Sequence, residues 1–178
     1  IHGAREELLQ LATLNGGNTR SDAKFDIDGA THTLSSYAQL GETLGERGFL
    51  LDGDPINIGR SGRYQGQHVL MPMPGVAVHI NAFNFPAWGF AEKAACAILS
   101  GMPVLCKPAT STALVTWRMF QVLEEAKVMP EGVASLLCGS AGDLLDHLGW
   151  ADVVAFTGSS DTARTIRQHP RVISEGVR

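Results

Sequence analysis

The sequence predicts an α/β fold: an open parallel sheet with flanking helices, preceded by a partial helical N-terminal segment. Two observations lead to this prediction. From residue 76 onward, short apolar, β-branched runs alternate with amphipathic stretches of about ten to fifteen residues, which is typical of repeated βαβ units. The residues before this point show helical spacing instead. We therefore expect two parts, a helical and linker segment over residues 1–74 and the sheet over residues 75–178.

The N-terminal segment is expected to begin with two helices. The first spans Ala4–Leu14 and ends at an Asn-Gly-Gly sequence. The second spans Ser21–Leu44 because apolar side chains recur there near helical spacing, although Gly29 weakens the pattern in its middle. Residues Gly45–Gly66 are rich in Gly, Asp and Arg, which predicts a loop or short extended structure. Gln67–Met71 is then expected to be a strand that leads into the sheet.

Four strands, each followed by a helix, are expected in the second part. The strands are Gly75–Ile80, Pro103–Lys107, Val133–Leu137 and Val153–Phe156. The helices are Trp88–Leu99, Ala113–Ala126, Ala141–Leu148 and Ser160–Gln168. Because a helix that joins two neighbouring strands crosses from one end of a sheet to the other, the strands are expected to be parallel.

Composition and charge exclude several classes of protein. The chain has 178 residues, of which 44% are hydrophobic, so it can build a core and is not expected to be disordered. Its formal charge of −4 gives no electrostatic footprint for nucleic acid or an anionic membrane surface. No apolar run reaches the roughly 18 uncharged residues that a spanning helix needs, so we expect neither nucleic acid nor a membrane as a partner.

The cysteines predict packing in a reducing compartment. Cys96, Cys106 and Cys138 are an odd number without CxxC spacing, so neither a disulfide framework nor a zinc site is indicated, and we expect no metal. Core packing is favoured over a nucleophilic role for each thiol. Free thiols in a chain without a secretory signal predict a cytoplasmic location.

Polar residues follow each expected strand at its carboxyl end, where open parallel sheets bind their ligands. They form four segments, Asn81–Pro86, Lys107–Thr110, Cys138–Gly142 and Thr157–Ser160. In a parallel sheet all four lie on one rim. Asn84 stands just before a proline that is favoured in the first turn of a helix, so its amide could stabilise a developing oxyanion at a strand-to-helix corner. The alternative, which spacing alone favours, is that Asn84 caps the helix.

The other three segments could hold a nucleotide. Lys107 ends a strand where its ammonium could meet a ribose or phosphate, and a solvated surface lysine is the alternative. Gly158 and Ser159 open the last helix, whose free N–H groups could receive a phosphate, while Ser159 could equally be an ordinary N-cap. Gly139 and Gly142 allow close backbone approach in the same way. The chain has neither GxGxxG nor GxxxxGK[ST].

Together these segments resemble the aldehyde dehydrogenase family. Asn84-Phe85-Pro86 resembles its Asn-Phe-Pro, Lys107-Pro108-Ala109 its Lys-Pro-Ala or Lys-Pro-Ser, and Phe156-Thr157-Gly158-Ser159 its Phe-Thr-Gly-Ser. Any one of these motifs is weak, whereas the set in this order is highly specific. The family's nucleotide-binding domain lacks the usual glycine fingerprint, and the resemblance implies a Rossmann-like NAD(P)-binding region over residues 75–178.

A more detailed likeness concerns the branch that oxidises CoA-linked semialdehydes in the aerobic degradation of benzoate and phenylacetate. His79–Pro86 and Cys138–Asp146 are similar to that branch, as are Asn18–Asp22 and Asp26–Gly29, so the resemblance covers nearly the whole chain. It implies a CoA-linked or free aldehyde as substrate, and a homodimer or larger assembly in the complete enzyme.

The resemblance also implies roles for single residues. Asn84 would be the side-chain donor of the oxyanion hole, Lys107 would contact the adenosine ribose, and Ser159 with Gly158 would meet the pyrophosphate. Thr110 stands where many NAD-using members carry a glutamate that binds both ribose hydroxyls. Because threonine removes a negative charge that would repel a 2′-phosphate, we expect NADP as the cofactor, with NAD as the second possibility.

The catalytic cysteine and the general-base glutamate of the family are expected downstream of Arg178. The chain is thus expected to be an internal fragment that is inactive alone. A competing hypothesis is a non-catalytic nucleotide-binding or assembly module. A third, an unrelated doubly wound hydrolase, would need a Gly-x-Ser-x-Gly sequence, which the chain lacks.

Overall fold

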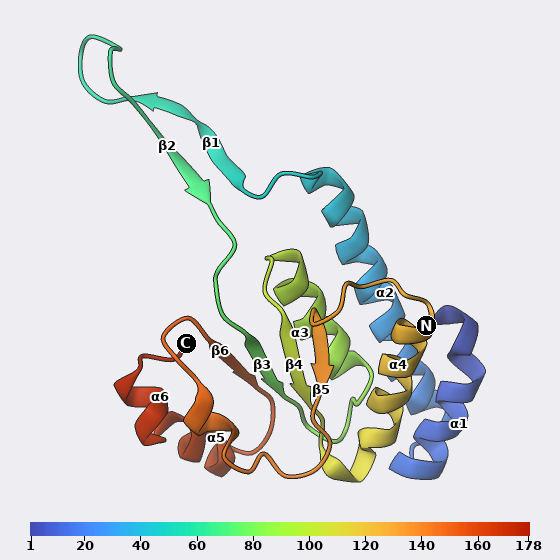
Figure 1. Ribbon diagram of the computed structural model, residues 1–178. Coiled ribbons are helices and arrows are strands. Elements are labelled where there is room, and N and C mark those ends of the chain that lie inside the picture. Colours follow the sequence, from blue (N-terminus) through green and yellow to red (C-terminus); the bar gives the residue numbers. More distant parts are fainter.

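The computed structural model describes residues 1–178 and contains a helical N-terminal part, a long hairpin and an α/β part (Figure 1). The helices are α1 (Arg5–Gly16), α2 (Arg20–Leu44), α3 (Trp88–Leu99), α4 (Ala113–Glu125), α5 (Ser160–Arg167) and α6 (Pro170–Ser174). The strands are β1 (Leu50–Asn57), β2 (Gln65–Leu70), β3 (Ala77–Ile80), β4 (Val104–Lys107), β5 (Ala134–Leu136) and β6 (Val153–Phe156). Three 3₁₀ turns complete the chain, η1 (His2–Ala4), η2 (Thr110–Thr112) and η3 (Leu144–His147). No helix is both long enough and apolar enough to cross a membrane.

The main sheet has four parallel strands in the order β5-β4-β3-β6. Ala77 of β3 lies beside Val104 of β4 on one side and Val153 of β6 on the other, so β3 is central. The crossover segments 88–99 and 113–125 are the helices α3 and α4. The predicted α/β fold, an open parallel sheet with flanking helices, is therefore confirmed.

The hydrophobic core lies between this sheet and two layers of helix. Phe90 of α3, Met119 of α4 and Val104 of β4 pack together, and α1 and α2 cover them with Leu8, Leu9 and Ile27, all of these side chains being almost fully buried. Cys106 belongs to the same cluster, and burial raises the pKa of its thiol to about 12. Its predicted role in core packing is confirmed.

The same prediction is wrong for the other two cysteines. Cys96 and Cys138 are both exposed. Cys96 lies two positions beyond the buried Ala94, which turns it about 200° around the helix and onto the solvent side. Cys138 follows the end of β5, an edge strand with no neighbour on its outer side.

Two further expectations are corrected. Ala141–Leu148 is not a helix, because Gly142 has a left-handed φ of +52° and only the short turn η3 forms before Leu148 becomes extended. Gly45–Gly66 contains a full strand, β1, which pairs antiparallel with β2 in a separate two-stranded sheet. Gln67–Met71 is therefore extended as expected but belongs to this hairpin, which projects away from the body (Figure 1).

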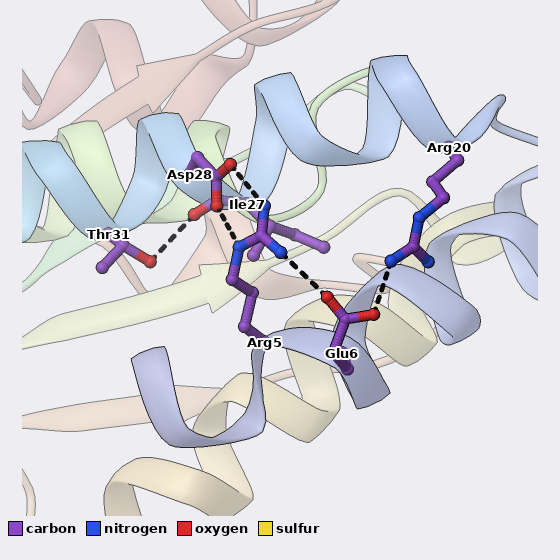
Figure 2. A network of polar contacts seen from close by, with 6 residues as sticks. All are labelled: Arg5, Glu6, Arg20, Ile27, Asp28 and Thr31. Carbon is purple, nitrogen blue, oxygen red and sulfur yellow. Dashed lines mark hydrogen bonds and ion pairs between the residues drawn. The ribbon is translucent and has the colours of Figure 1, made fainter.

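An ionic network joins α1 to α2 at the surface (Figure 2). Both Oδ atoms of Asp28 accept from Arg5, at 2.6 and 2.7 Å, and Glu6 bridges Arg5 to Arg20. The hydrogen bond from Arg5 lowers the pKa of Asp28. Because these groups are solvated, the network contributes little to stability beside the buried leucines. Asp26, two residues before Asp28 on α2, reaches the start of α3 with its side chain.

Candidate functional site

The four segments that sequence analysis singled out follow the carboxyl ends of β3, β4, β5 and β6, which all run the same way. The ladder of backbone hydrogen bonds continues to this rim. Asn81 N–H donates to Lys107 C=O at 3.1 Å, and Thr157 N–H donates to Ile80 C=O at 2.9 Å. The segments after β4 and β6 thus lie on either side of the segment that carries Asn84.

Asn84 lies in the corner between β3 and α3. Its side chain is exposed and makes no hydrogen bond within the chain. The N-cap of α3 is Ala87, and the capping oxygens come from Asp26 of α2, which accepts from Ala87 N at 3.1 Å and Trp88 N at 2.7 Å. The capping interpretation of Asn84 is therefore wrong, because a carboxylate sixty residues earlier fills that role. The Asn84 amide stays available to a ligand.

Two threonines also bond the backbone of this corner. Thr112 Oγ1 donates to Phe83 C=O at 3.0 Å, and Thr116 Oγ1 donates to Pro86 C=O at 2.7 Å. Sequence reasoning missed both, and it noted Asp26 only as part of a resembling motif. None of the three carries a local signal, since each bonds an element far away along the chain.

Beneath the rim lies a buried polar cluster that sequence analysis also missed. Lys93 Nζ donates to Asn81 Oδ1 at 2.8 Å, and the Asn81 amide lies 3.5 Å from Cys106 Sγ. Burial lowers the pKa of Lys93. Burial, with a smaller effect of the Lys93 charge, lowers the pKa of His79 to about 4, and its buried Nδ1 has no partner. His79 is therefore neutral at pH 7.

His79 should make stability depend on pH. Its pKa of about 4 lies below the ordinary 6.5, so between these values the unfolded chain binds the proton more readily and the folded state loses stability as pH falls. The slope is at most about 1.4 kcal/mol per pH unit. We expect the thermal midpoint of the wild type to fall more steeply across this window than that of His79→Leu. Midpoints that fall in parallel in the two proteins would contradict this prediction. Asp26 and Lys93 are present in both proteins, so their own titration does not affect the difference between the two curves.

The segment after β4 bonds the segment after β5. Thr110 Oγ1 donates to Gly139 C=O at 3.3 Å, so its proton would have to turn away from Gly139 before it could reach a bound phosphate. Lys107 Nζ donates to Pro108 C=O at 3.1 Å, which leaves two of its N–H groups free. Gly139 has a φ of +106°, a conformation that side chains rarely adopt, so glycine is needed there for its backbone.

The start of α5 is built as an ordinary capped helix. Ser159 Oγ accepts from Thr162 N at 3.2 Å, so the alternative in which Ser159 is an N-cap is confirmed. Thr162 N–H is taken up by this bond, so the N–H groups of Ser160 and Asp161 are the ones in the first turn that remain for an anion. A Cβ on Gly158 would collide with the ring of Phe156, so only glycine fits at this position.

An aromatic cluster borders the Asn84 corner. Phe25 of α2 lies edge-on to Trp88, with ring centroids 5.3 Å apart, and Phe85 lies 6.2 Å from the same ring. The contact with Trp88 explains why glycine occupies position 29 in the middle of α2, because a side chain there would collide with the indole ring. The indole nitrogen donates to Thr33 Oγ1 at 2.9 Å. A cavity of about 870 Å³ lies elsewhere, between α4 and β5.

Gly29→Ala should destabilise the fold despite the better helix propensity of alanine. The new Cβ would stand 2.6 Å from the Trp88 ring, which must shift at a cost of about 1–3 kcal/mol. Gly41→Ala on the same helix is the matched control, since its Cβ meets only the tip of Leu99, at 3.1 Å. We expect a lower thermal midpoint for the first variant and an unchanged or higher one for the second. Equal midpoints would show that the Trp88 contact is loose.

Comparison with known proteins identifies relatives for the whole chain. The family model described as the aldehyde dehydrogenase family matches residues 1–174. The chain is 49% identical to 3,4-dehydroadipyl-CoA semialdehyde dehydrogenase from Aromatoleum evansii over all its length, which is 35% of that protein. It is 30% identical to betaine aldehyde dehydrogenase from Bacillus subtilis, with 90% of this chain and 31% of that protein covered.

Solved structures agree with these sequences. Betaine aldehyde dehydrogenase from Staphylococcus aureus in complex with NAD+ matches with a TM-score of 0.81 at 27% identity, over 99% of this chain and 33% of that one. The sheet and helices described above thus have the Rossmann-like fold of such enzymes. The chain spans about a third of the length of the relatives it matches.

Proposed function

The chain belongs to the aldehyde dehydrogenase family, and we propose that it forms the nucleotide-binding region and the oxyanion donor of an enzyme that oxidises a CoA-linked semialdehyde. The chain spans only about a third of its relatives' length. By complete enzyme we mean these residues together with segments that correspond to the rest of those relatives. One observation carries the proposal: Asn84 has an exposed amide without a hydrogen bond, in a corner where other side chains bond the backbone of Phe83, Pro86 and Ala87.

The chemistry assigned to Asn84 follows from its free donor. In the complete enzyme a thiolate, supplied outside these residues, attacks the aldehyde carbon and converts the carbonyl oxygen to an oxyanion. The Asn84 N–H₂ group donates to that oxygen, and the bond strengthens as negative charge develops. When bound, the nicotinamide cofactor supplies the capacity to accept hydride. Once hydride has left the carbon, a thioester remains, and water hydrolyses its C–S bond to release the acid and the thiolate.

We propose NADP as the preferred cofactor, with NAD accepted. The rim fits a dinucleotide: the Thr110 hydroxyl lies beside Gly139, where a Cβ would meet nothing, and the Lys107 ammonium at the end of β4 keeps two free N–H groups. The segment Lys107–Thr110 holds no carboxylate, so nothing within it would repel a 2′-phosphate. The backbone at Ser159 and the start of α5 would hold the pyrophosphate.

The proposed substrate is an acyl-CoA semialdehyde formed during aromatic compound catabolism. Its support is the 49% identity to a relative named for 3,4-dehydroadipyl-CoA semialdehyde. The complete enzyme should form NADPH with a CoA-linked semialdehyde at a kcat/KM at least about tenfold above that for the same aldehyde without CoA. Equal values would show that CoA is not recognised and would reduce the proposal to an aldehyde dehydrogenase without CoA specificity. If no aldehyde gave NADPH, the competing hypothesis of a non-catalytic nucleotide-binding module would be supported.

We further propose that the complete enzyme is a cytoplasmic homodimer or larger assembly. The hairpin supports the oligomer, because Leu51, Ile56 and Val69 project from it without covering neighbours, and an isolated two-stranded sheet is marginally stable. A second copy is the occupant we assign to it. Light scattering should give at least twice the subunit mass for the wild type and a smaller mass for Val69→Asp. A monomeric wild type would contradict this assignment.

A further inference from the structure

The corner that carries Asn84 is fixed by side chains from three other parts of the chain. Asp26 of α2 accepts from two backbone N–H groups at the start of α3. Thr112 of η2 and Thr116 of α4 donate to the carbonyls of Phe83 and Pro86, one on each side of Asn84. These three residues are 1%, 5% and 0% exposed. The bonds from Thr116 to Pro86 and from Ala87 to Asp26 are buried and thus shielded from competing water, while the other two are partly buried.

This arrangement buries a carboxylate, which the start of a helix does not require. A serine or threonine at the N-cap would satisfy the first N–H groups of α3 locally, yet the N-cap is Ala87 and the acceptor is a buried carboxylate. Burial raises the pKa of Asp26, and only the two N–H bonds oppose that effect. Buried polar groups that are fully bonded confer a single conformation on the backbone around them.

The Asn84 side chain has no hydrogen bond of its own, so the backbone of the corner has to set where its amide lies. We propose that Asp26, Thr112 and Thr116 are positioning residues, which hold the corner so that the Asn84 amide faces the reacting oxygen. This inference rests on the proposed function, because it assigns the three bonds to the same donor. A donor displaced by about 1 Å loses on the order of 10²-fold in rate, so the corner must be rigid for Asn84 to act.

Thr116 gives the sharpest test because valine has its shape and lacks only the hydroxyl. In the complete enzyme we expect Thr116→Val to lower the single-turnover rate of NADPH formation by about 10- to 100-fold, with the KM for NADP unchanged. Thr116→Ser, which restores the hydroxyl, should recover most of that loss. Thr31→Val is the matched control: Thr31 Oγ1 donates to a backbone carbonyl within α2, at Ile27, and its loss should leave the rate unchanged. Figure 2 shows this control bond.

A double-mutant cycle separates positioning from general damage to the fold. If Thr116 acts through Asn84, adding Thr116→Val to Asn84→Ala lowers the rate no further. If the two losses multiply, Thr116 serves the fold only and the proposal is overturned. Thr112→Val repeats the cycle should the first variant fail to fold, since its bond to the exposed residue Phe83 is only partly buried.

Failure of the proposed function is recognised separately. Near-normal rates in Asn84→Ala alone would show that Asn84 is not an oxyanion donor, and the three residues would then have no catalytic group to position. A large loss in Asn84→Ala together with multiplying losses would keep the oxyanion role and remove only the positioning role.

Discussion

Asn84→Ala is expected to slow the chemical step of the complete enzyme by about 10²–10³-fold, the typical cost of removing one oxyanion donor. The loss arises in the transition state, because the amide bonds the oxygen most strongly when that oxygen carries negative charge. It should therefore appear in kcat and in kcat/KM alike. The measurement is the single-turnover rate of NADPH formation with a saturating aldehyde.

A second substitution at the same site tests the donor itself. Asn84→Asp keeps the size of the side chain but offers only acceptors to the oxyanion, so it should lose at least as much rate as alanine. The affinity for NADP should change little in both variants, since we propose that the adenosine and pyrophosphate bind at other segments of the rim. Rates within a factor of about three of the wild type, in either variant, would leave Asn84 without a chemical role.

Thr110→Glu should move the cofactor preference from NADP toward NAD by about 10²-fold in the ratio of their kcat/KM values. A carboxylate near a 2′-phosphate costs several kcal/mol at an effective dielectric of about 20, and screening reduces this to roughly 3 kcal/mol. The same carboxylate can accept hydrogen bonds from the ribose hydroxyls of NAD. The substitution also removes the bond from Thr110 to Gly139, which holds two rim segments together.

Thr110→Gln distinguishes charge from the loss of that bond. Glutamine has the length of glutamate without its charge, so it should weaken both cofactors similarly and leave their ratio near that of the wild type. Steady-state ratios that do not change in the glutamate variant would remove the basis for expecting NADP.

Much of the sheet and of its rim could be predicted, because the sequence patterns that indicate them lie within a few neighbouring residues. Short apolar runs fix β3, β4 and β6, and the residues that follow each strand must meet at one edge once the strands are parallel. The place of Ser159 before a helix allows an N-cap as one of two interpretations, and the structure shows this cap. Such features depend on neighbours within a few residues.

The supports of the site could not be predicted, because each joins positions far apart. Asp26 bonds a helix that begins 62 residues later, and Thr116 bonds a carbonyl 30 residues earlier. No periodicity records such pairs. Gly29 illustrates the opposite case, in which a residue that weakens a helical pattern is required by a tertiary contact with Trp88.

The exposed cysteines and the lost helix have a different cause. Apolar neighbours made Cys96 and Cys138 resemble core residues, although the position of one on its helix and of the other beyond an edge strand decides their exposure. Across residues 141–148 the composition favours a helix, yet the left-handed backbone at Gly142 prevents one from starting there.

The crystal structure of the complete enzyme with bound NADP+ tests the central claim most directly. We expect the 2′-phosphate beside Lys107 and Thr110, the pyrophosphate against the first turn of α5, and the Asn84 amide facing the nicotinamide end. A nucleotide at the amino ends of the strands, or an Asn84 side chain on the face away from the nicotinamide, would contradict the account.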